Sequence, residues 1–158
     1  MASASPPLKD RLQADLTTAM KARDVVRSAT IRMALTAVRA EEVSGTTART
    51  LTDAEVTTVL GREAKKRREA AVAYQDAGRD ELAQRERAEL EVLAEYLPKQ
   101  LSDDDLAAIV AEQVSAVAAS GVSGKAAMGA VMKAVQPKVA GQAEGGRVAA
   151  EVRRQLGV

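Results

Sequence analysis

Two lysines and a glycine at steps of four residues form the pattern in this sequence that most favours binding chemistry: Lys125, Gly129 and Lys133. On a helix the three share one face, so a residue without a side chain lies between two ammonium groups. The backbone of a polyanion could approach the helix closely at this point. The alternative is that Gly129 only lets a neighbouring helix pack closely and that the lysines are simply solvated, as most surface charges are.

A second candidate anion site lies at the start of the last predicted helix, over 146–156. Gly145 and Gly146 offer free backbone amides there, and Arg147 adds a positive charge, so a phosphate could be received. Glu144 could cap the same amides internally and so compete with an anion. The candidate anion-binding residues are Lys125, Gly129, Lys133, Lys138, Gly145, Gly146, Arg147 and Arg154.

Acidic clusters are the other groups that could do chemistry. Glu86 and Glu89 are three residues apart, and residues 103–105 are three adjacent aspartates. Arginines next to the glutamates favour ordinary surface ion pairs over acid–base catalysis. Consecutive aspartates diverge on a helix and complement its dipole behind the N-cap Ser102, which favours capping over a metal site. The sequence predicts no catalytic residue, no metal site and no cofactor.

Histidine and cysteine are both absent from the 158 residues. Their absence excludes a cysteine nucleophile, a Ser-His-Asp triad, histidine acid–base catalysis, disulfides and a zinc site built from the usual ligands. No apolar run reaches the roughly 20 residues of a membrane helix, and the amino terminus lacks the apolar core of a signal peptide. We expect a cytoplasmic protein with no membrane association.

Composition indicates an all-α fold. Hydrophobic residues make up 46% of the chain, yet it contains two tyrosines and neither phenylalanine nor tryptophan. A core of Leu, Val, Ala and Met suits closely packed helices better than a sheet. The net charge of +1 argues against a globally basic nucleic-acid binder. However, basic residues are in excess in 9–39 and in 120–158, so the surface is polarised if the fold brings these segments together.

Hydrophobic periodicity predicts the helices that must position these residues. Residues 1–7 are expected to be disordered, and Pro98 marks the best candidate boundary between an N-terminal helical bundle over 8–97 and a small tail domain over 98–158. The segment 137–146 is predicted to be a turn. The predicted helices cover about 8–23, 25–43, 53–76, 80–96, 102–120, 125–136 and 146–156.

Local signals support the first three helices. Thr52 and Glu55 form a capping box, and Asp24 is a plausible cap for the second helix. Met20, Val26 and Met33 fall on the apolar faces of the first two helices and are expected to point inward.

Arg67 belongs to the densest basic run of the chain, Lys65 to Arg68. Four consecutive residues on a helix point in different directions, so the run cannot form one patch. Arg67 lies one turn after Glu63 and close to the apolar face of its helix. We therefore expect it to be a partly buried partner of Glu63 or Glu89 rather than a ligand-binding residue.

Two stretches, LKDRLQADLTTAMKARD (8–24) and KKRREAAVAYQDAGRDELAQRERAELEVLAEYLPKQLS (65–102), resemble the GatB/YqeY family, as does the glycine-containing tail. Residues 77–102 are the most specific part of the resemblance. Members share a helical region and a tail domain with the GatB component of the aspartyl/glutamyl-tRNA amidotransferase. The chain is more similar to the freestanding YqeY form, because the residues before Leu8 are too few for the catalytic domain of GatB. The turn over 141–146 and Ala130, which follows Gly129, depart from the family pattern.

The resemblance implies a helical bundle followed by a three-helix tail. It also implies a ligand, because the tail of GatB is associated with contacting tRNA, whereas amide transfer uses residues of other parts of that enzyme. Family labels of the type "glutamine-dependent carbon–nitrogen ligase" therefore do not imply that this chain is an enzyme.

Two functional hypotheses follow. The first is a non-catalytic adaptor in translation that binds tRNA through the tail residues named above. The alternative is a protein–protein interaction module that docks on an aminoacyl-tRNA synthetase or on a component of the amidotransferase without binding RNA.

Overall fold

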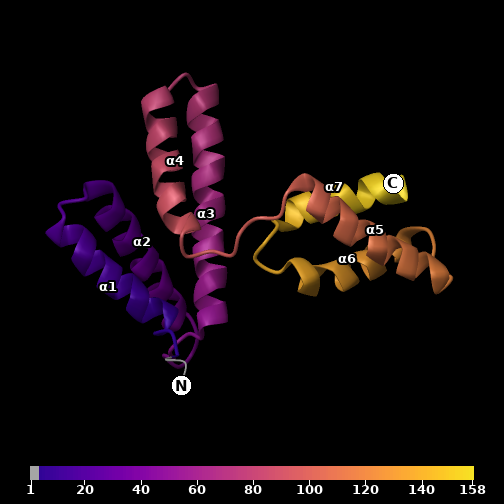
Figure 1. Cartoon of the computed structure of the whole chain (residues 1–158), viewed down its shortest axis with the longest axis horizontal. Coiled ribbons are helices and arrows are strands. Elements are labelled where there is room, and N and C mark those ends of the chain that lie inside the picture. The colour runs from indigo at the N-terminus through magenta and orange to yellow at the C-terminus, as the bar shows by residue number, and fades with distance from the viewer. Residues whose placement is uncertain (1–3) are drawn as a thin grey trace. The chain divides into compact units, whose positions relative to one another are not determined.

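The computed structural model describes residues 4–158, and all its regular elements in that range are helices (Figure 1). This confirms the predicted all-α fold class. Residues 1–3, part of the segment expected to be disordered, lie outside the described residues, and residues 4–7 are exposed and precede the first helix. The helices are α1 (Leu8–Lys21), α2 (Val25–Glu42), α3 (Asp53–Asp76), α4 (Asp80–Ala94), α5 (Asp103–Ala119), α6 (Lys125–Val139) and α7 (Gly145–Leu156).

The chain divides into two compact units, the first ending at Leu97 and the second beginning at Pro98. We call them the N-terminal unit (α1–α4) and the tail unit (α5–α7) and describe each by itself. In the described part of the chain, none of the helices is both long and apolar enough to cross a membrane.

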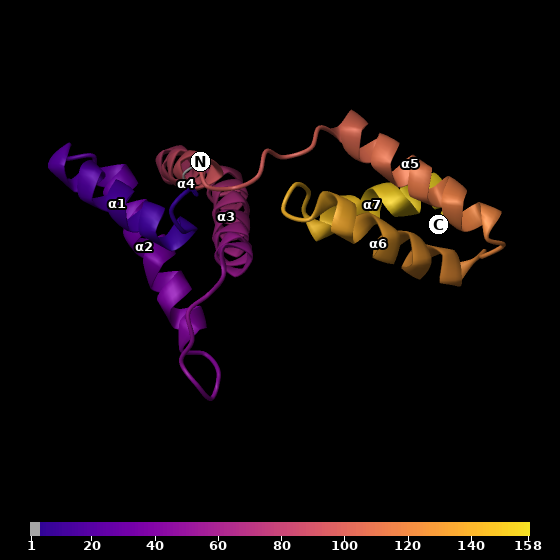
Figure 2. The ribbon, with the colours of Figure 1, turned by 60° about the horizontal axis from the view of Figure 1, so that its bottom comes forward.

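The N-terminal unit consists of two helical hairpins, α1–α2 and α3–α4, which pack on each other mainly through α2 (Figures 1 and 2). Helices α2 and α3 begin where the sequence predicts. Asp24 accepts a hydrogen bond from the Arg27 amide at 3.0 Å and caps α2. Thr52 and Glu55 form both bonds of the capping box at the start of α3. The shared core is built from aliphatic side chains together with Tyr96 from the segment after α4.

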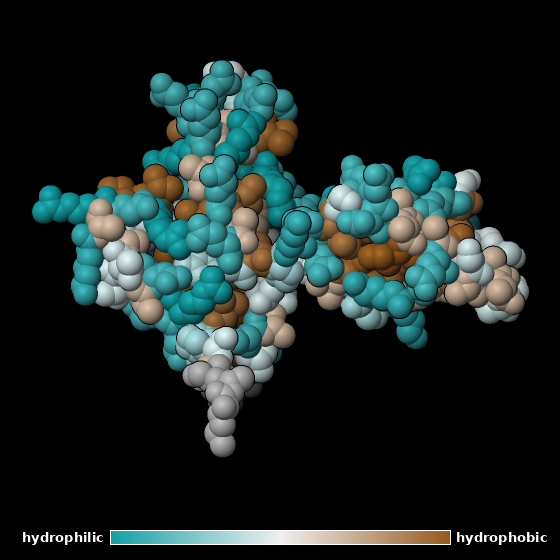
Figure 3. Space-filling view, viewed as in Figure 1, coloured by the Kyte–Doolittle hydropathy of each residue, from teal (hydrophilic) through white to brown (hydrophobic). Residues whose placement is uncertain are grey.

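Three residues of α1 and α2 that were expected to point inward are exposed. Met20, Val26 and Met33 keep 50%, 41% and 51% of their surface in contact with solvent. For Val26 and Met33 the prediction was wrong because α2 buries a narrower apolar stripe, which runs from Ile31 to Val38. For Met20 it was wrong because the buried side of α1 carries Leu12, Leu16 and Ala19 instead. Hydrophobic surface is visible over this hairpin in Figure 3.

The tail unit is a three-helix arrangement in which each helix contacts the other two. Figure 2 shows the three helices, α5, α6 and α7. The core of the unit consists of one apolar stripe from each helix. The buried members of these stripes are Leu106, Val110, Val131, Val135, Val139, Val148 and Val152.

Helix α6 continues past the residue where it was expected to stop. Pro137 lies inside the helix, which ends at Val139 instead of Gln136. Pro137 cannot donate a backbone hydrogen bond, but Val139 is almost completely buried, since only 3% of its surface is exposed, and it extends the stripe of Val131 and Val135 by one turn. Burial of this side chain compensates for the missing bond. The predicted turn over 137–146 is therefore shorter and begins after Val139.

Candidate nucleic-acid interface

Lys125, Gly129 and Lys133 lie together on an exposed face of α6. This face is opposite the buried stripe that includes Val131 and Val135, so it points away from the other two helices of the unit. A Cβ added to Gly129 would meet no atom within 4 Å. The alternative explanation, that Gly129 lets a neighbouring helix pack closely, is therefore wrong for the described chain. We call Lys125, Gly129 and Lys133 the α6 face.

The positive charges of the α6 face are not neutralised locally. Ion pairs within the tail unit join Arg147 to Asp103 and Arg154 to Glu151. Lys125, Lys133 and the exposed Lys138 have no carboxylate partner among the described residues. Lys125 and Lys133 are eight residues apart, which corresponds to about 12 Å along a helix. An anion would meet two solvated ammonium groups with open backbone between them.

Arg147 connects the start of α7 to the start of α5 through hydrogen bonds. Its guanidinium donates to the carbonyl of Leu101 at 3.0 Å and to the carboxylate of Asp103 at 2.8 Å. An anion at this guanidinium would have to compete with Asp103. The structure therefore gives Arg147 an internal role that the sequence did not predict.

Arg154 is also engaged within the unit. Its guanidinium makes two hydrogen bonds to Glu151, at 2.9 and 2.6 Å. Hydrogen bonds from Arg154 and then from Gln155 lower the pKa of the Glu151 carboxyl to about 2, and Glu151 in turn raises the pKa of Arg154. Gln155 also donates to the Ala107 carbonyl of α5 at 2.9 Å. Arg154 and Arg147 thus lie on the flank of α7 beside α5, whereas the α6 face points away from both helices.

The start of α7 has exposed backbone. Gly145 and Gly146 are exposed, and the first backbone hydrogen bond here joins the Val148 amide to the Glu144 carbonyl at 3.0 Å. Glu144 occupies the N-cap position, but its side chain makes no capping hydrogen bond. The expected internal cap is therefore wrong, and the first amides of α7 point out of the helix end, as they do at other helix starts.

The acidic clusters have structural roles. Ser102 accepts a hydrogen bond from the Asp105 amide at 3.1 Å, so the predicted cap of α5 is confirmed and the three aspartates lie in its first turn. No group of three or more acidic side chains that could hold a metal ion is found in residues 4–158.

Arg67 is a buried partner of two glutamates, as predicted. Its guanidinium donates to Glu89 at 3.2 Å and to Glu63 at 3.1 Å, and its side chain is 4% exposed. Burial alone would raise the pKa of Glu63, but the hydrogen bonds from Lys66 and Arg67 outweigh it and lower the pKa. Glu89 also pairs with Arg85 at 3.4 Å, as its neighbouring arginines predict, but it is buried and not at the surface as expected.

Tyr96 connects the end of the N-terminal unit to α1 and α2. Its hydroxyl donates to Asp15, and the guanidinium of Arg11 lies 4.8 Å from the centre of its ring. Burial and the hydrogen bond to Asp15 raise the pKa of Tyr96 to about 12. Arg27 donates to both carboxylate oxygens of Glu95, at 3.0 and 2.8 Å. Arg27 is therefore engaged internally and is not free to extend a basic surface.

The sequence pattern did not reveal a pocket beside the α1–α2 turn, where Arg23 and Arg32 lie among apolar side chains. The signal that could have drawn attention to it is the pair of arginines that flank Val25 and Ala29. That both arginines line one pocket depends on the turn geometry, which the sequence does not specify.

These features describe an all-helical protein of two units with an exposed basic face on the tail. A model of the family described as Yqey-like protein matches residues 9–156. The chain belongs to this YqeY-like family.

A curated relative carries the name "Altered inheritance of mitochondria protein 41, mitochondrial" and comes from Clavispora lusitaniae (strain ATCC 42720). It is 33% identical over 90 residues, which are 57% of this chain and 51% of the relative. The chain therefore matches about half the length of that relative. The relative's name includes the word mitochondrial, and the cytoplasmic location expected for this chain stays a prediction.

Proposed function

We propose that this YqeY-like chain is a non-catalytic adaptor that binds tRNA through the backbone phosphates, with the α6 face as the main contact. Lys125 and Lys133 supply the charge, and Gly129 allows the phosphate backbone to approach the helix. One observation carries the proposal: Gly129 is exposed, has no neighbour that a Cβ would meet, and lies between two lysines without a carboxylate partner among the described residues.

The choice of tRNA rests on the family. The chain resembles the helical region and tail of the amidotransferase component GatB, whose tail is associated with tRNA contact. Recognition would use shape and phosphates, because both tyrosines, at positions 74 and 96, precede the tail unit and the chain has no Phe or Trp. The tail thus offers no aromatic platform on which an unpaired base could stack.

The start of α7 supplies a secondary contact in this proposal. The exposed Gly145 and Gly146 present backbone amides, and Lys138 adds a positive charge from the last turn of α6. Arg147 and Arg154 contribute less, since each would have to exchange a carboxylate partner for a phosphate. We expect their removal to loosen the tail unit more than it weakens RNA binding directly.

Binding of a labelled tRNA transcript, followed by fluorescence anisotropy over a salt series, tests the proposal. Each phosphate contact is expected to contribute about −0.7 to −0.9 to the slope of log K against log salt. The variant Lys125→Gln/Lys133→Gln should bind more weakly and with a shallower slope. Lys99→Gln/Arg153→Gln is the matched control, since it removes the same charge from exposed tail residues outside the α6 face. Absence of binding at low salt, or equal losses in both variants, would contradict the proposal.

A second candidate function is a protein-docking module without RNA binding. The observation that favours it is the exposed hydrophobic side chains of the α1–α2 hairpin, Met20, Val25 and Met33. An aminoacyl-tRNA synthetase or a component of the amidotransferase would be the partner in this case. The same titration distinguishes the two candidates, because a module of this kind would leave the anisotropy of the tRNA unchanged.

A further inference from the structure

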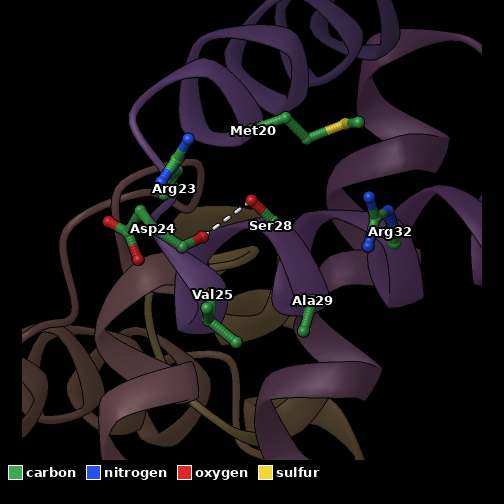
Figure 4. A pocket seen from close by; sticks show the side chains of 7 residues that line it. All are labelled: Met20, Arg23, Asp24, Val25, Ser28, Ala29 and Arg32. Carbon is green, nitrogen blue, oxygen red and sulfur yellow. Dashed lines mark hydrogen bonds between the residues drawn. The ribbon is translucent and has the colours of Figure 1, made fainter.

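We propose that the pocket beside the α1–α2 turn is a docking site for an acidic segment of a partner protein that carries an apolar anchor side chain. The pocket lies in the N-terminal unit, has a volume of about 300 Å³, and is shown in Figure 4. This proposal goes beyond tRNA binding by the tail, because the pocket lies in the N-terminal unit and combines apolar and cationic side chains. Its lining residues are Met20, Arg23, Asp24, Val25, Ser28, Ala29 and Arg32.

The middle of the pocket is apolar. Met20 and Val25 are 50% and 78% exposed, although side chains of this kind are usually buried. In Figure 4, Met20 lies on one side of the opening and Val25 and Ala29 on the other. Ser28 does not make the centre polar, because its hydroxyl donates to the Asp24 carbonyl at 2.7 Å. An apolar side chain of a partner would remove this surface from water.

An arginine lies at each end of the pocket. Arg23 and Arg32 lie on opposite sides of it in Figure 4, and neither guanidinium has a hydrogen bond or ion pair with any described residue. The Asp24 carboxylate also lines the pocket beside Arg23, where it accepts the Arg27 amide as the cap of α2, so the lining carries two positive charges and one negative charge. Guanidinium groups bind carboxylates with two parallel hydrogen bonds. The complementary ligand therefore has acidic side chains on both sides of an apolar one.

The backbone conformation of Arg23 holds its side chain at one end of the pocket. Arg23 adopts φ of 55°, a left-handed conformation that favours glycine. Its amide donates to the Met20 carbonyl at 3.1 Å, and the Asp24 amide donates to Ala19 at 2.9 Å. These two bonds form the Schellman motif that ends α1, in which this position is usually glycine. An arginine here places a charged side chain on the rim at a cost in backbone strain.

The apolar centre favours a protein ligand over a nucleic acid. A phosphate backbone would use the two arginines and leave Met20 and Val25 in water. The volume suits one or two side chains, since it is at the lower end of the range for ligand pockets. Methionine is flexible and adapts to different apolar partners.

The test uses the full chain labelled with carbon-13 at the methionine methyl groups and a synthetic peptide in which one leucine lies between two pairs of glutamates. The chain has five methionines, of which Met20 lines the pocket, Met33 lies outside it, and Met128 and Met132 report on the tail unit. The peptide should shift the Met20 signal and leave the tail signals unchanged. Replacement of the peptide leucine by serine should remove most of this effect.

Arg23→Glu/Arg32→Glu should weaken peptide binding roughly tenfold or more, because two charge-assisted contacts are lost. The matched control, Lys125→Glu/Lys133→Glu, makes the same change of charge in the tail unit and should bind the peptide normally. Circular dichroism shows whether each variant remains folded, and both pairs of side chains are exposed. The proposal is overturned by an unchanged Met20 signal, by normal peptide binding of the pocket variant, or by an oligouridylate that shifts Met20 as the peptide does. Since tRNA binding is measured separately with the tail variant, failure of one proposal is distinguishable from failure of the other.

Discussion

Replacement of Gly129 by alanine should stabilise the tail unit. Glycine in the middle of a helix is less favourable than alanine by about 1 kcal/mol, and Gly129 lies inside α6, which extends from Lys125 to Val139. A Cβ here would meet no atom within 4 Å, so steric conflict should not reduce the gain. For a unit of this size, 1 kcal/mol corresponds to an increase in melting temperature of about 4–8 °C.

The two units can be followed separately in this experiment. Tyr74 and Tyr96 are the only tyrosines and both lie in the N-terminal unit, so tyrosine fluorescence reports on that unit. The methyl signals of Met128 and Met132 report on the tail, and circular dichroism reports on both. Ala108→Gly in α5, at an exposed position, is the control and should lower tail stability by about 1 kcal/mol.

The same position separates stability from binding. If RNA approaches the α6 backbone, Gly129→Leu should weaken tRNA binding roughly tenfold while the helix remains at least as stable as in the natural protein. Destabilisation by Gly129→Ala would show that a neighbour occupies the space and would refute the structural reasoning. Normal tRNA binding by Gly129→Leu would refute the role of glycine in close approach.

Three further predictions concern the N-terminal unit. Arg67→Met should cost about 3 kcal/mol in urea unfolding, the lower end of the range for breaking a buried ion pair, because Glu63 and Glu89 lose their buried partner and keep only the exposed Lys66 and Arg85. A smaller loss when Glu89→Leu is added would support this cause, and equal losses would contradict it. The pKa of Tyr96 is raised from 10.0 to about 12, so its neutral form stabilises the fold below pH 10. This contribution should be lost as the pH rises towards 12. If the melting temperature of Tyr96→Phe falls equally steeply over this interval, the tyrosine is not the cause. Arg23→Gly should stabilise the unit by about 0.5–1 kcal/mol, because the relief of left-handed strain exceeds the entropy cost of glycine, while it weakens peptide binding; a lower melting temperature would contradict this.

The helices could be predicted because local signals and burial agree. The caps at Asp24, Thr52 and Ser102 each mark a helix start that the structure confirms. The end of α6 could not be predicted, because the local effect of Pro137 is outweighed by the burial of Val139 in the tail core. The exposure of Met33 could not be predicted for a similar reason, since only the packing of the hairpins decides which part of a wide apolar face is buried.

The candidate site was predictable in its residue types and less so in its charge balance. Helical spacing alone was enough to put Lys125, Gly129 and Lys133 on one face. It could not show that Arg147 is held by Asp103, because the two residues lie at the starts of different helices. Nor could it show that Arg23 adopts a left-handed conformation, which depends on how α1 ends.

The salt dependence of tRNA binding tests the central claim most directly. If Lys125 and Lys133 each neutralise one phosphate, the slope of log K against log salt should become shallower by about 1.4–1.8 in Lys125→Gln/Lys133→Gln than in the natural protein. An unchanged slope, or no tRNA binding by the natural protein at low salt, would contradict the account.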